Sequence, residues 1–220
     1  MIKRISALLL LLGFQNYAFS QRLDFIKGVA SSYLMGINWS SWTDYPQNIK
    51  VNSFSNRGFE YLQINKYNKD KVIRLYLGLG ISSNNFHTDV AIWGFDSTGT
   101  LKTGGIITDY ISNKLNVVHA NGWAELNYHA KTDKDKEGFR IGAGFKVGYR
   151  IDQHTKWHTS LQTVKYKKVD ALNNYSYGPT LRIGFKGYSL FGQYGMVSLF
   201  SKADKTLYKP VLIGLLIGQL

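Results

Sequence analysis

The sequence predicts an all-β fold: an eight-stranded antiparallel up-and-down transmembrane β-barrel with short periplasmic turns and long outer loops. Three observations predict it. Apolar and polar residues alternate along segments of about ten residues, aromatic residues stand at the ends of the apolar faces, and short connections alternate with long ones. A soluble β-sandwich also shows alternation. The membrane is therefore indicated by the strand length, the aromatic positions and the connections.

The clearest alternation runs through residues 139–150. Its odd positions, from Phe139 to Tyr149, are apolar, whereas its even positions, from Arg140 to Arg150, are glycine or a cation. Successive side chains of a strand point to opposite faces, so one face is apolar and the other polar. The remaining expected strands, which bring the total to eight, are residues 29–40, 59–66, 72–82, 115–128, 177–186, 188–197 and 210–220.

Aromatic residues bracket the apolar faces. Phe139 and Tyr149 stand at the ends of one expected strand, and Tyr177 and Phe185 stand near the ends of another. Ten tilted residues span about 25 Å, which is the height of the apolar band between the two aromatic girdles of a membrane barrel. The pattern predicts that these faces meet lipid.

The connections between the expected strands fall into two series. The short ones are residues 67–71, 129–138 and 186–188, and the long ones are residues 41–58, 83–114, 151–176 and 198–209. Outer-membrane barrels have short periplasmic turns and longer outer loops. The sequence therefore predicts a cell outer-membrane protein of a Gram-negative bacterium.

The first twenty residues have the layout of a secretory signal peptide. Lys3 and Arg4 precede an apolar run over residues 5–14, and small residues stand at Ala18 and Ser20. The run is half the length of a membrane-anchor helix. We expect residues 1–20 to be a signal peptide and residues 21–220 to form the barrel domain.

The net charge of +13 and the absence of cysteine limit the possible partners. Without cysteine there is no disulfide, thiolate metal site or lipoprotein anchor. Export argues against nucleic acid, and a basic surface also suits anionic head groups. We therefore expect outer-membrane lipid or lipopolysaccharide as a partner. The basic stretch 165–168 is either a solvated segment or a contact to lipopolysaccharide phosphates.

The polar strand faces point into a narrow interior. An eight-stranded barrel has room inside only for side chains, and glycine on this face leaves space for long ones. Buried charges need partners, so we expect a packed ionic lumen and no open channel. The candidate lumen charge network is Arg74, Glu125, Arg140, Lys146, Arg150, Arg182 and Lys186, with Glu125 as the acidic member.

The long connection 83–114 contains apolar residues, Phe86, Ile92, Trp93 and Phe95. Exposed apolar groups flanked by polar ones mark protein contacts, and aromatic residues are favoured anchors. This segment is either a contact surface for another envelope protein or a lid over the barrel mouth that buries Trp93.

Neither a cofactor nor a metal site is expected. His154 and His158 have the spacing of a metal pair on a helix, but they fall in an expected loop with no cysteine and no nearby carboxylate other than Asp152. His119 and Glu125 could serve a lipid- or lipopolysaccharide-modifying enzyme, which is the alternative function. No nucleophile is marked by a motif, so we expect a protein that is not an enzyme.

Motifs in the second half of the chain resemble the PorT-like outer-membrane β-barrel family. They are Arg140 to Gly144, Lys146, Gly148 to Ile151, His154 to Lys156, Tyr177, Gly178, Thr180, Arg182 to Gly184, Tyr208, Pro210 and Gly214. The central strand departs from the family pattern: Trp123 stands near the usual tyrosine and Glu125 at the usual glutamate, but the usual proline is absent.

The resemblance implies an outer-membrane location. Through one founding member, it also implies a link to type IX secretion or gliding. Most members of the family have no assigned activity. Together with the closed lumen expected above, it predicts a structural or accessory component of the cell envelope.

Overall fold

The computed structural model describes residues 30–45, 50–52, 54–68, 71–89, 92–95, 101–103, 110–130, 138–167, 169, 172–201 and 207–218. The predicted signal peptide lies outside the described residues. No helix in the described part of the chain is long and apolar enough to span a membrane.

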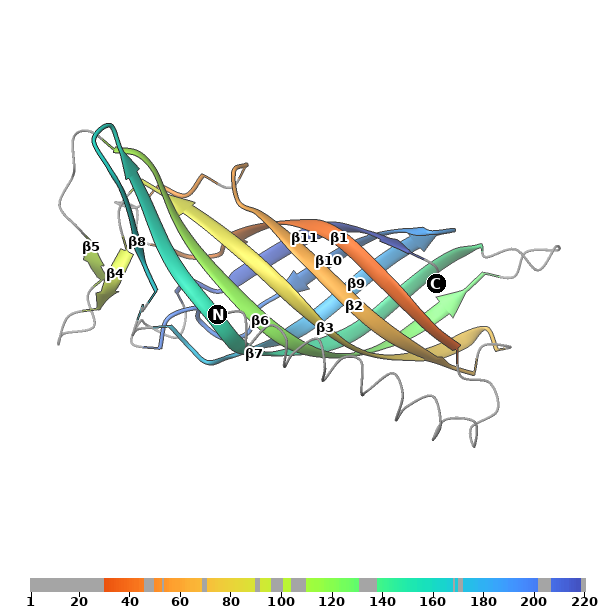
Figure 1. Ribbon diagram of the computed structural model, residues 1–220. Coiled ribbons are helices and arrows are strands. Elements are labelled where there is room, and N and C mark those ends of the chain that lie inside the picture. Colours follow the sequence, from red (N-terminus) through yellow and green to blue (C-terminus); the bar gives the residue numbers. More distant parts are fainter. Residues whose placement is uncertain are drawn as a thin grey trace, which may run out of the picture.

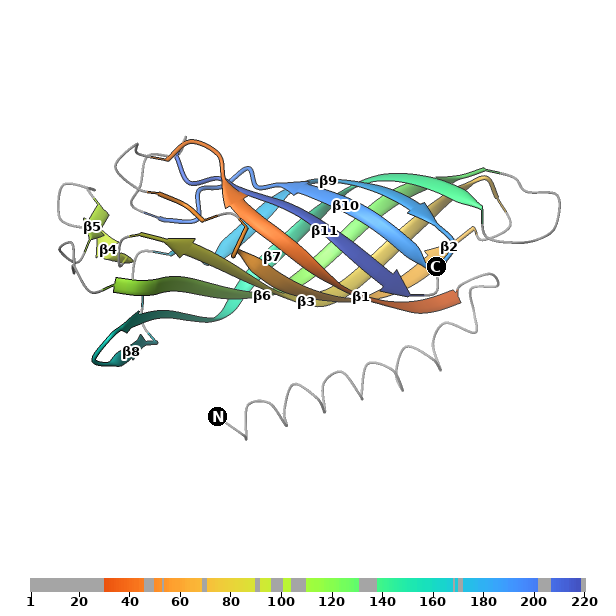
Figure 2. The same ribbon diagram turned by 90° about the horizontal axis from the view of Figure 1, so that it is seen from above.

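Eight strands form a closed antiparallel barrel, as the sequence predicts. They are β1 (Ala30–Trp42), β2 (Arg57–Tyr67), β3 (Ile73–Thr88), β6 (Tyr110–His129), β7 (Phe139–Thr159), β9 (Tyr175–Phe185), β10 (Tyr188–Tyr194) and β11 (Pro210–Gly218). The order is β6-β3-β2-β1-β11-β10-β9-β7, and pairing of β6 with β7 closes the ring. The strands are inclined to the long axis of the barrel (Figures 1 and 2).

Three short strands lie beyond one end of the ring. β4 (Ile92–Phe95) pairs with β5 (Leu101–Thr103), and β8 (Thr163–Tyr166) pairs with the last residues of β7. Figure 1 shows all three at the end toward which β6 and β7 project. We call this the loop end, and we call the opposite end, where β1 begins and β11 finishes, the turn end.

Strands β3, β6 and β7 are longer than predicted and take up part of the expected loops 83–114 and 151–176. β3 continues to Thr88, and β6 and β7 have 20 and 21 residues. Along this extension the outward side chains are mostly polar, whereas nearer the turn end they are mostly apolar, and the inward side chains include both apolar residues such as Phe86 and polar ones such as Asn84. Polar outward residues bond each other there, since Asn116 Nδ2 donates to Ser83 Oγ and to Asn85 Oδ1, both at 2.8 Å.

The switch in pattern coincides with an irregularity in the ladder between β6 and β7. Val118 pairs with Asp152, whereas the next residue, His119, pairs with Arg150. Ile151 is thus the extra residue of a β-bulge, a device that re-aims the residues that follow it. Beyond Ile151, the even-numbered residues of β7 face outward instead of the odd-numbered ones.

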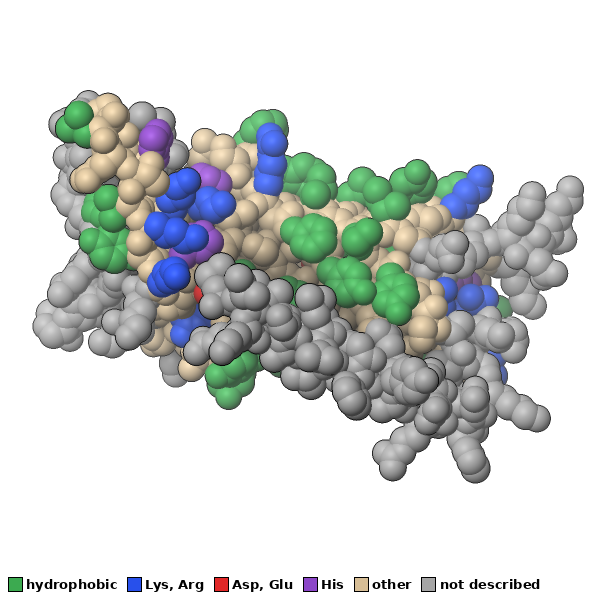
Figure 3. Space-filling model, viewed as in Figure 1, with side chains coloured by type: hydrophobic (Ala, Val, Ile, Leu, Met, Phe, Trp, Pro, Cys, Tyr) green, Lys and Arg blue, Asp and Glu red, His purple; other side chains and the backbone are tan. Residues whose placement is uncertain are grey.

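The outer wall below this bulge is a belt of exposed apolar side chains (Figure 3). Its members include Met35, Ile37, Leu79, Phe145, Val147, Leu181, Ile183, Leu190, Ile213, Leu215 and Ile217. Tyrosines stand near its two edges, among them Tyr149 and Tyr175 toward the loop end and Tyr188 at the turn end. A soluble monomer rarely exposes so large a continuous apolar surface, whereas a transmembrane barrel requires it.

A charged substitution in the belt tests its contact with lipid. Leu181 lies on the outer face of β9 between Tyr177 and Phe185. We expect Leu181→Arg to lower the free energy of unfolding in lipid vesicles by about 2–4 kcal/mol, since the cation would enter hydrocarbon. The control is Leu161→Arg, in the exposed turn between β7 and β8, which should stay within about 0.5 kcal/mol. Equal effects would show that the belt does not face hydrocarbon.

Candidate functional site

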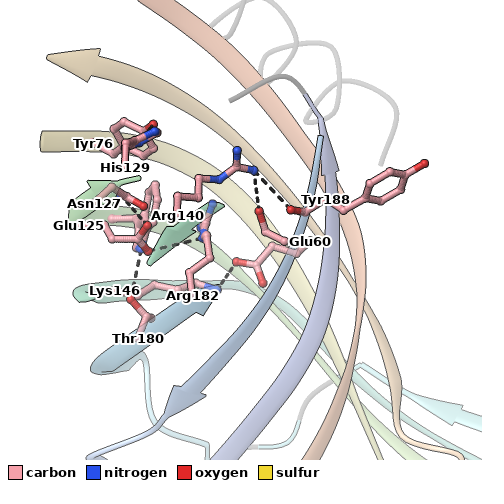
Figure 4. A network of polar contacts seen from close by, with 12 residues as sticks. Glu60, Tyr76, Glu125, Asn127, His129, Arg140, Lys146, Thr180, Arg182 and Tyr188 are labelled. Carbon is pink, nitrogen blue, oxygen red and sulfur yellow. Dashed lines mark hydrogen bonds and ion pairs between the residues drawn. The ribbon is translucent and has the colours of Figure 1, made fainter. Parts of the chain in front are cut away.

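The lumen holds an ion pair that joins two strands that are not neighbours. Lys146 Nζ on β7 donates to Glu60 Oε1 on β2, and the two side chains are 5% and 1% exposed. Strands β6 and β3 lie between β7 and β2 in the ring. The pair therefore spans the interior and ties opposite parts of the wall together (Figure 4).

A second ion pair lies closer to the turn end and is surrounded by supporting contacts. Arg182 Nε lies 3.5 Å from Glu125 Oε2, and Asn127 Nδ2 donates to Glu125 Oε1 at 2.7 Å. The guanidinium carbon of Arg182 lies 4.3 Å from the centre of the Trp123 ring, whose Nε1 donates to Thr180 Oγ1 at 3.3 Å. Cation–π attraction strengthens when the cation is shielded from water, so this arrangement holds Arg182 in place.

Arg140 is another buried cation. Its Nη2 donates to Ser189 Oγ at 3.0 Å and to the Tyr188 carbonyl at 3.4 Å. Nearby, the Tyr76 hydroxyl and His129 Nε2 share a hydrogen bond of 2.8 Å. These groups fill the lumen toward the turn end with polar contacts rather than with open space (Figure 4).

Two lumen glycines leave the room that these long side chains occupy. A Cβ on Gly184 would lie 2.9 Å from Arg140 Cγ, and one on Gly142 would lie 2.7 Å from Glu125 Cδ. Real Cβ atoms do not approach so closely. The spacing role predicted for glycine on the polar faces is thus confirmed at these two positions.

Adding a methyl group at one of these glycines should destabilise the barrel. We expect Gly184→Ala to lower the free energy of unfolding by about 1–3 kcal/mol, because Arg140 must shift in a packed interior. Gly122→Ala is the control, since its Cβ would meet only Leu79 Cδ2 at 4.0 Å. Urea unfolding in detergent micelles measures both. If both variants lose the same stability, the space beside Arg140 is not the cause.

The structure places four of the seven predicted network residues in the lumen: Glu125, Arg140, Lys146 and Arg182. Arg74 and Arg150 are only half-buried. Arg74 Nε donates to the Lys71 carbonyl at 3.1 Å near the end of β3, and Arg150 Nη2 donates to Asn174 Oδ1 at 2.6 Å.

The prediction for Lys186 is wrong. Lys186 is exposed in the tight turn between β9 and β10, with φ of 50°, and its Nζ lies 5.3 Å from the centre of the Phe185 ring. β9 ends at Phe185, so the alternation that would have carried Lys186 inward stops one residue before it.

Sequence reasoning missed the carboxylate that pairs with Lys146. Glu60 lies in a segment that was predicted as a strand, between Phe59 and Tyr61. It shares its strand face with Leu62 and Ile64, so alternation alone did not mark it as a member of a polar face. Its partner on β7 was not readable without the register of the closed barrel.

Above the ion pairs lies a cavity of about 20 Å³. Ser82, His119, Asn121, Lys146 and Gln193 are among the residues that line it, and Asn121 Nδ2 donates to Ser82 Oγ at 2.9 Å. A polar cavity of this size holds about one water molecule.

An apolar cluster closes the lumen at the loop end. We call it the cap; its buried members are Trp42, Phe86, Leu115, Val117, Val169, Leu172, Leu199, Phe200 and Tyr208. The Trp42 ring stacks on Phe86 at 5.0 Å between centres and meets Tyr208 edge-on at 5.4 Å. Backbone bonds fasten it, including Thr43 N to the Lys209 carbonyl at 2.9 Å.

The cap corrects the prediction for Phe86. This residue was expected in a partner-binding loop, but it is 1% exposed in β3 and packs beneath Trp42. Its alternation with Asn85 and His87 turns it inward. Ile92, Trp93 and Phe95 fall in β4, and their side chains lie outside what the structure describes, so the choice between a contact and a lid stays a prediction for them.

The residues considered for metal binding and catalysis are not brought together. His154 and His158 lie in β7, not in a loop, and His158 Nδ1 shares a hydrogen bond of 2.7 Å with Thr163 Oγ1. No group of three potential ligands occurs within the described ranges. His119 and Glu125 lie six residues apart on β6, about 20 Å, and Glu125 binds Arg182 instead.

No protein-family model and no curated protein matches the chain. Among solved structures, the chain is similar to Ail, the attachment invasion locus protein of Yersinia pestis, with 13% sequence identity. The match covers 88% of this chain and 99% of that chain, with a TM-score of 0.42. The PorT-like resemblance therefore rests on its motifs, and the architecture rests on the hydrogen-bond ladders that close this chain into an eight-stranded barrel.

Proposed function

We propose that this chain is an outer-membrane barrel that serves as a structural or accessory component of the cell envelope, with its loop end outside the cell. The closed lumen carries the proposal. Two ion pairs, a cavity of about 20 Å³ and the cap fill the interior. A barrel filled in this way supports a role for its outer surfaces rather than a role as a conduit.

The loop end offers an ordered surface for such a role. β6 and β7 stay paired from the level of Ala120 and Tyr149 to Tyr110 and Thr159. These ten residues extend about 25 Å along the axis at barrel tilt. A preformed sheet loses less conformational entropy on binding than a loop does. The sheet of β6, β7 and β8 is thus the part of the described chain best suited to hold another envelope component.

A narrower version of the proposal places the barrel near the type IX secretion or gliding apparatus. Its support is the PorT-like motifs of the second half. A lipid- or lipopolysaccharide-modifying enzyme is the alternative function. Its candidate residues gain no support from geometry, because Glu125 contacts Arg182 and Asn127 and does not orient His119.

Site-specific cross-linking in whole cells tests the proposal. A photoreactive residue replaces Tyr166, exposed on β8, or Tyr188 at the turn end as the control. We expect a discrete protein adduct from position 166 that is missing from position 188. No adduct at position 166, or the same adducts at both, would contradict an accessory role at the loop end.

Planar-bilayer recording tests the closed lumen separately. The purified, refolded chain should show no steady conductance, because the cap and the ion pairs leave no continuous water path. A stable, large conductance would contradict the closed-barrel part of the proposal while leaving the cross-linking result to be judged alone.

A further inference from the structure

Four basic side chains stand directly opposite one another on four neighbouring strands. His87 on β3 pairs in register with Lys114 on β6, Lys114 pairs with Lys156 on β7, and Lys156 pairs with Lys165 on β8. We call these four residues the basic row. Neighbouring strands lie about 4.8 Å apart, so the row is about 14 Å long.

The basic row faces outward from the barrel wall. His87 and Lys114 are half-buried, and Lys156 and Lys165 are exposed, whereas the neighbours Phe86 and Leu115 point into the cap. Figure 3 shows basic side chains and histidines gathered at this end of the molecule, beyond the apolar belt. His154 lies on the same outward face of β7, two residues from Lys156.

Like charges directly opposite each other in a sheet destabilise it. In the basic row this repulsion acts on the pKa of Lys114 and of His87. Burial lowers the pKa of Lys114, and the Lys156 and Lys165 ammonium groups lower it further. Burial and Lys114 likewise lower the pKa of His87. The cations therefore lie close enough to repel one another.

The acidic residues that the structure describes do not neutralise the row. Within the described ranges, no carboxylate forms an ion pair with Lys114, Lys156 or Lys165. Asp152, on the same face, has its charge effect on His154, whose pKa it raises. Asp89 accepts a hydrogen bond from the backbone N–H of Lys50. An external anion would stabilise a row of cations that has no acidic partner among these residues.

The height of the row indicates which anion can reach it. Tyr149 pairs with Ala120 at the edge of the apolar belt, and Lys114 lies six residues farther along β6. This places the row about 15 Å beyond the belt edge along the axis. The row lies on the outer wall of the barrel and not in its lumen. Phospholipid head groups end below this height, whereas lipopolysaccharide carries phosphates on its core sugars above the head group.

We propose that His87, Lys114, Lys156 and Lys165 form a binding site for the phosphate groups of lipopolysaccharide on the outer wall of the barrel. The site rests on the outer-membrane location proposed above and not on the accessory role. Lysine binds phosphate as a point charge, and its long side chain can reach toward the membrane surface. A row of such side chains holds more than one phosphate.

The test measures binding of purified lipopolysaccharide with a phosphorylated core to the folded full chain in a mild non-ionic detergent. Lys156→Gln/Lys165→Gln removes the two exposed cations of the row. Lys71→Gln/Lys186→Gln removes two exposed cations at the turn end and is the matched control. Each lysine of the basic row that lies near a phosphate layer strengthens the binding of lipopolysaccharide. We therefore expect the affinity for lipopolysaccharide to fall by at least about tenfold in the first variant and to stay unchanged in the second.

Three further arms identify the ligand. Lys156→Arg/Lys165→Arg should restore binding, enzymatic removal of the phosphates should abolish it, and rising salt should weaken it steeply. Equal losses in the two glutamine variants, or full binding of the dephosphorylated lipid, would overturn the proposal. Saturation by millimolar inorganic phosphate would reassign the row to a soluble anion, and tighter binding of an acidic polypeptide would reassign it to a protein partner.

The heat-dependent gel shift of a folded barrel shows whether each variant has folded. If the glutamine variant does not fold, the phosphatase and salt arms on the unmodified chain still decide the question. Membrane fractionation of cells reports the outer-membrane location independently, so a barrel that fractionates correctly but does not bind lipopolysaccharide refutes the site alone.

Discussion

Replacing Lys146 with methionine should lower the free energy of unfolding by about 3–5 kcal/mol, because the Glu60 carboxylate would be left buried without its cation. Both side chains are almost fully enclosed in the lumen, so water cannot take the place of the ammonium group. Methionine keeps the approximate volume, which separates the loss of charge from the loss of packing. Urea unfolding in micelles, followed by tryptophan fluorescence, measures the change.

The double variant Lys146→Met/Glu60→Leu is the control for this prediction. It removes both charges together, and a buried ion pair replaced by apolar groups of similar size is often neutral or stabilising. We therefore expect it to recover most of the stability lost in Lys146→Met. A double variant as unstable as the single one would show that side-chain packing, and not the unpaired carboxylate, explains the loss.

Replacing Trp42 with alanine should cost about 3–5 kcal/mol of folding stability and open the cap. Trp42 contacts Phe86, Phe200 and Tyr208 through ring faces and edges, and its removal leaves a cavity that these residues fill only in part. Equilibrium unfolding measures the stability. Bilayer recording should still show no steady conductance, because the ion pairs below the cap keep the lumen filled.

Trp39→Ala is the matched control for the cap. Trp39 lies three residues away on β1 and is 38% exposed on the outer wall, whereas Trp42 is 4% exposed. Its loss should cost less than half as much stability and leave the bilayer recording unchanged. If the two variants lose the same stability, the indole of Trp42 does not hold the cap together.

The closed barrel was predictable because the lipid-facing wall imposes a simple pattern on the sequence. Residues 139–150 show it most clearly, and β7 begins at Phe139 as expected. The extensions of β3, β6 and β7 were missed because their outward side chains are mostly polar. Ser83, Asn85 and His87 are the outward residues of the β3 extension, and polar outward residues in a strand resemble loop residues when lipid is the expected surroundings.

The lumen network was predictable in residue type but not in its pairing. Alternation put Glu125, Lys146 and Arg182 on the inner face, where the structure has them. The bond from Lys146 to Glu60 depends on which residues face each other across the interior, and that follows from strand register and barrel closure. A single sequence carries no measure of either quantity for strands that are not adjacent.

The bulge at Ile151 fixes how deep the barrel sits in its membrane. Up to that residue the outward side chains of β7 are apolar, and directly after it they are Asp152, His154 and Lys156. If the barrel sat one residue pair deeper, Asp152 would enter the hydrocarbon. If it sat one pair higher, apolar residues of the belt would be exposed to water. The single extra residue thus marks the level at which the outer wall of β7 changes from lipid-facing to water-facing. It also sets the height of the loop-end residues above the membrane.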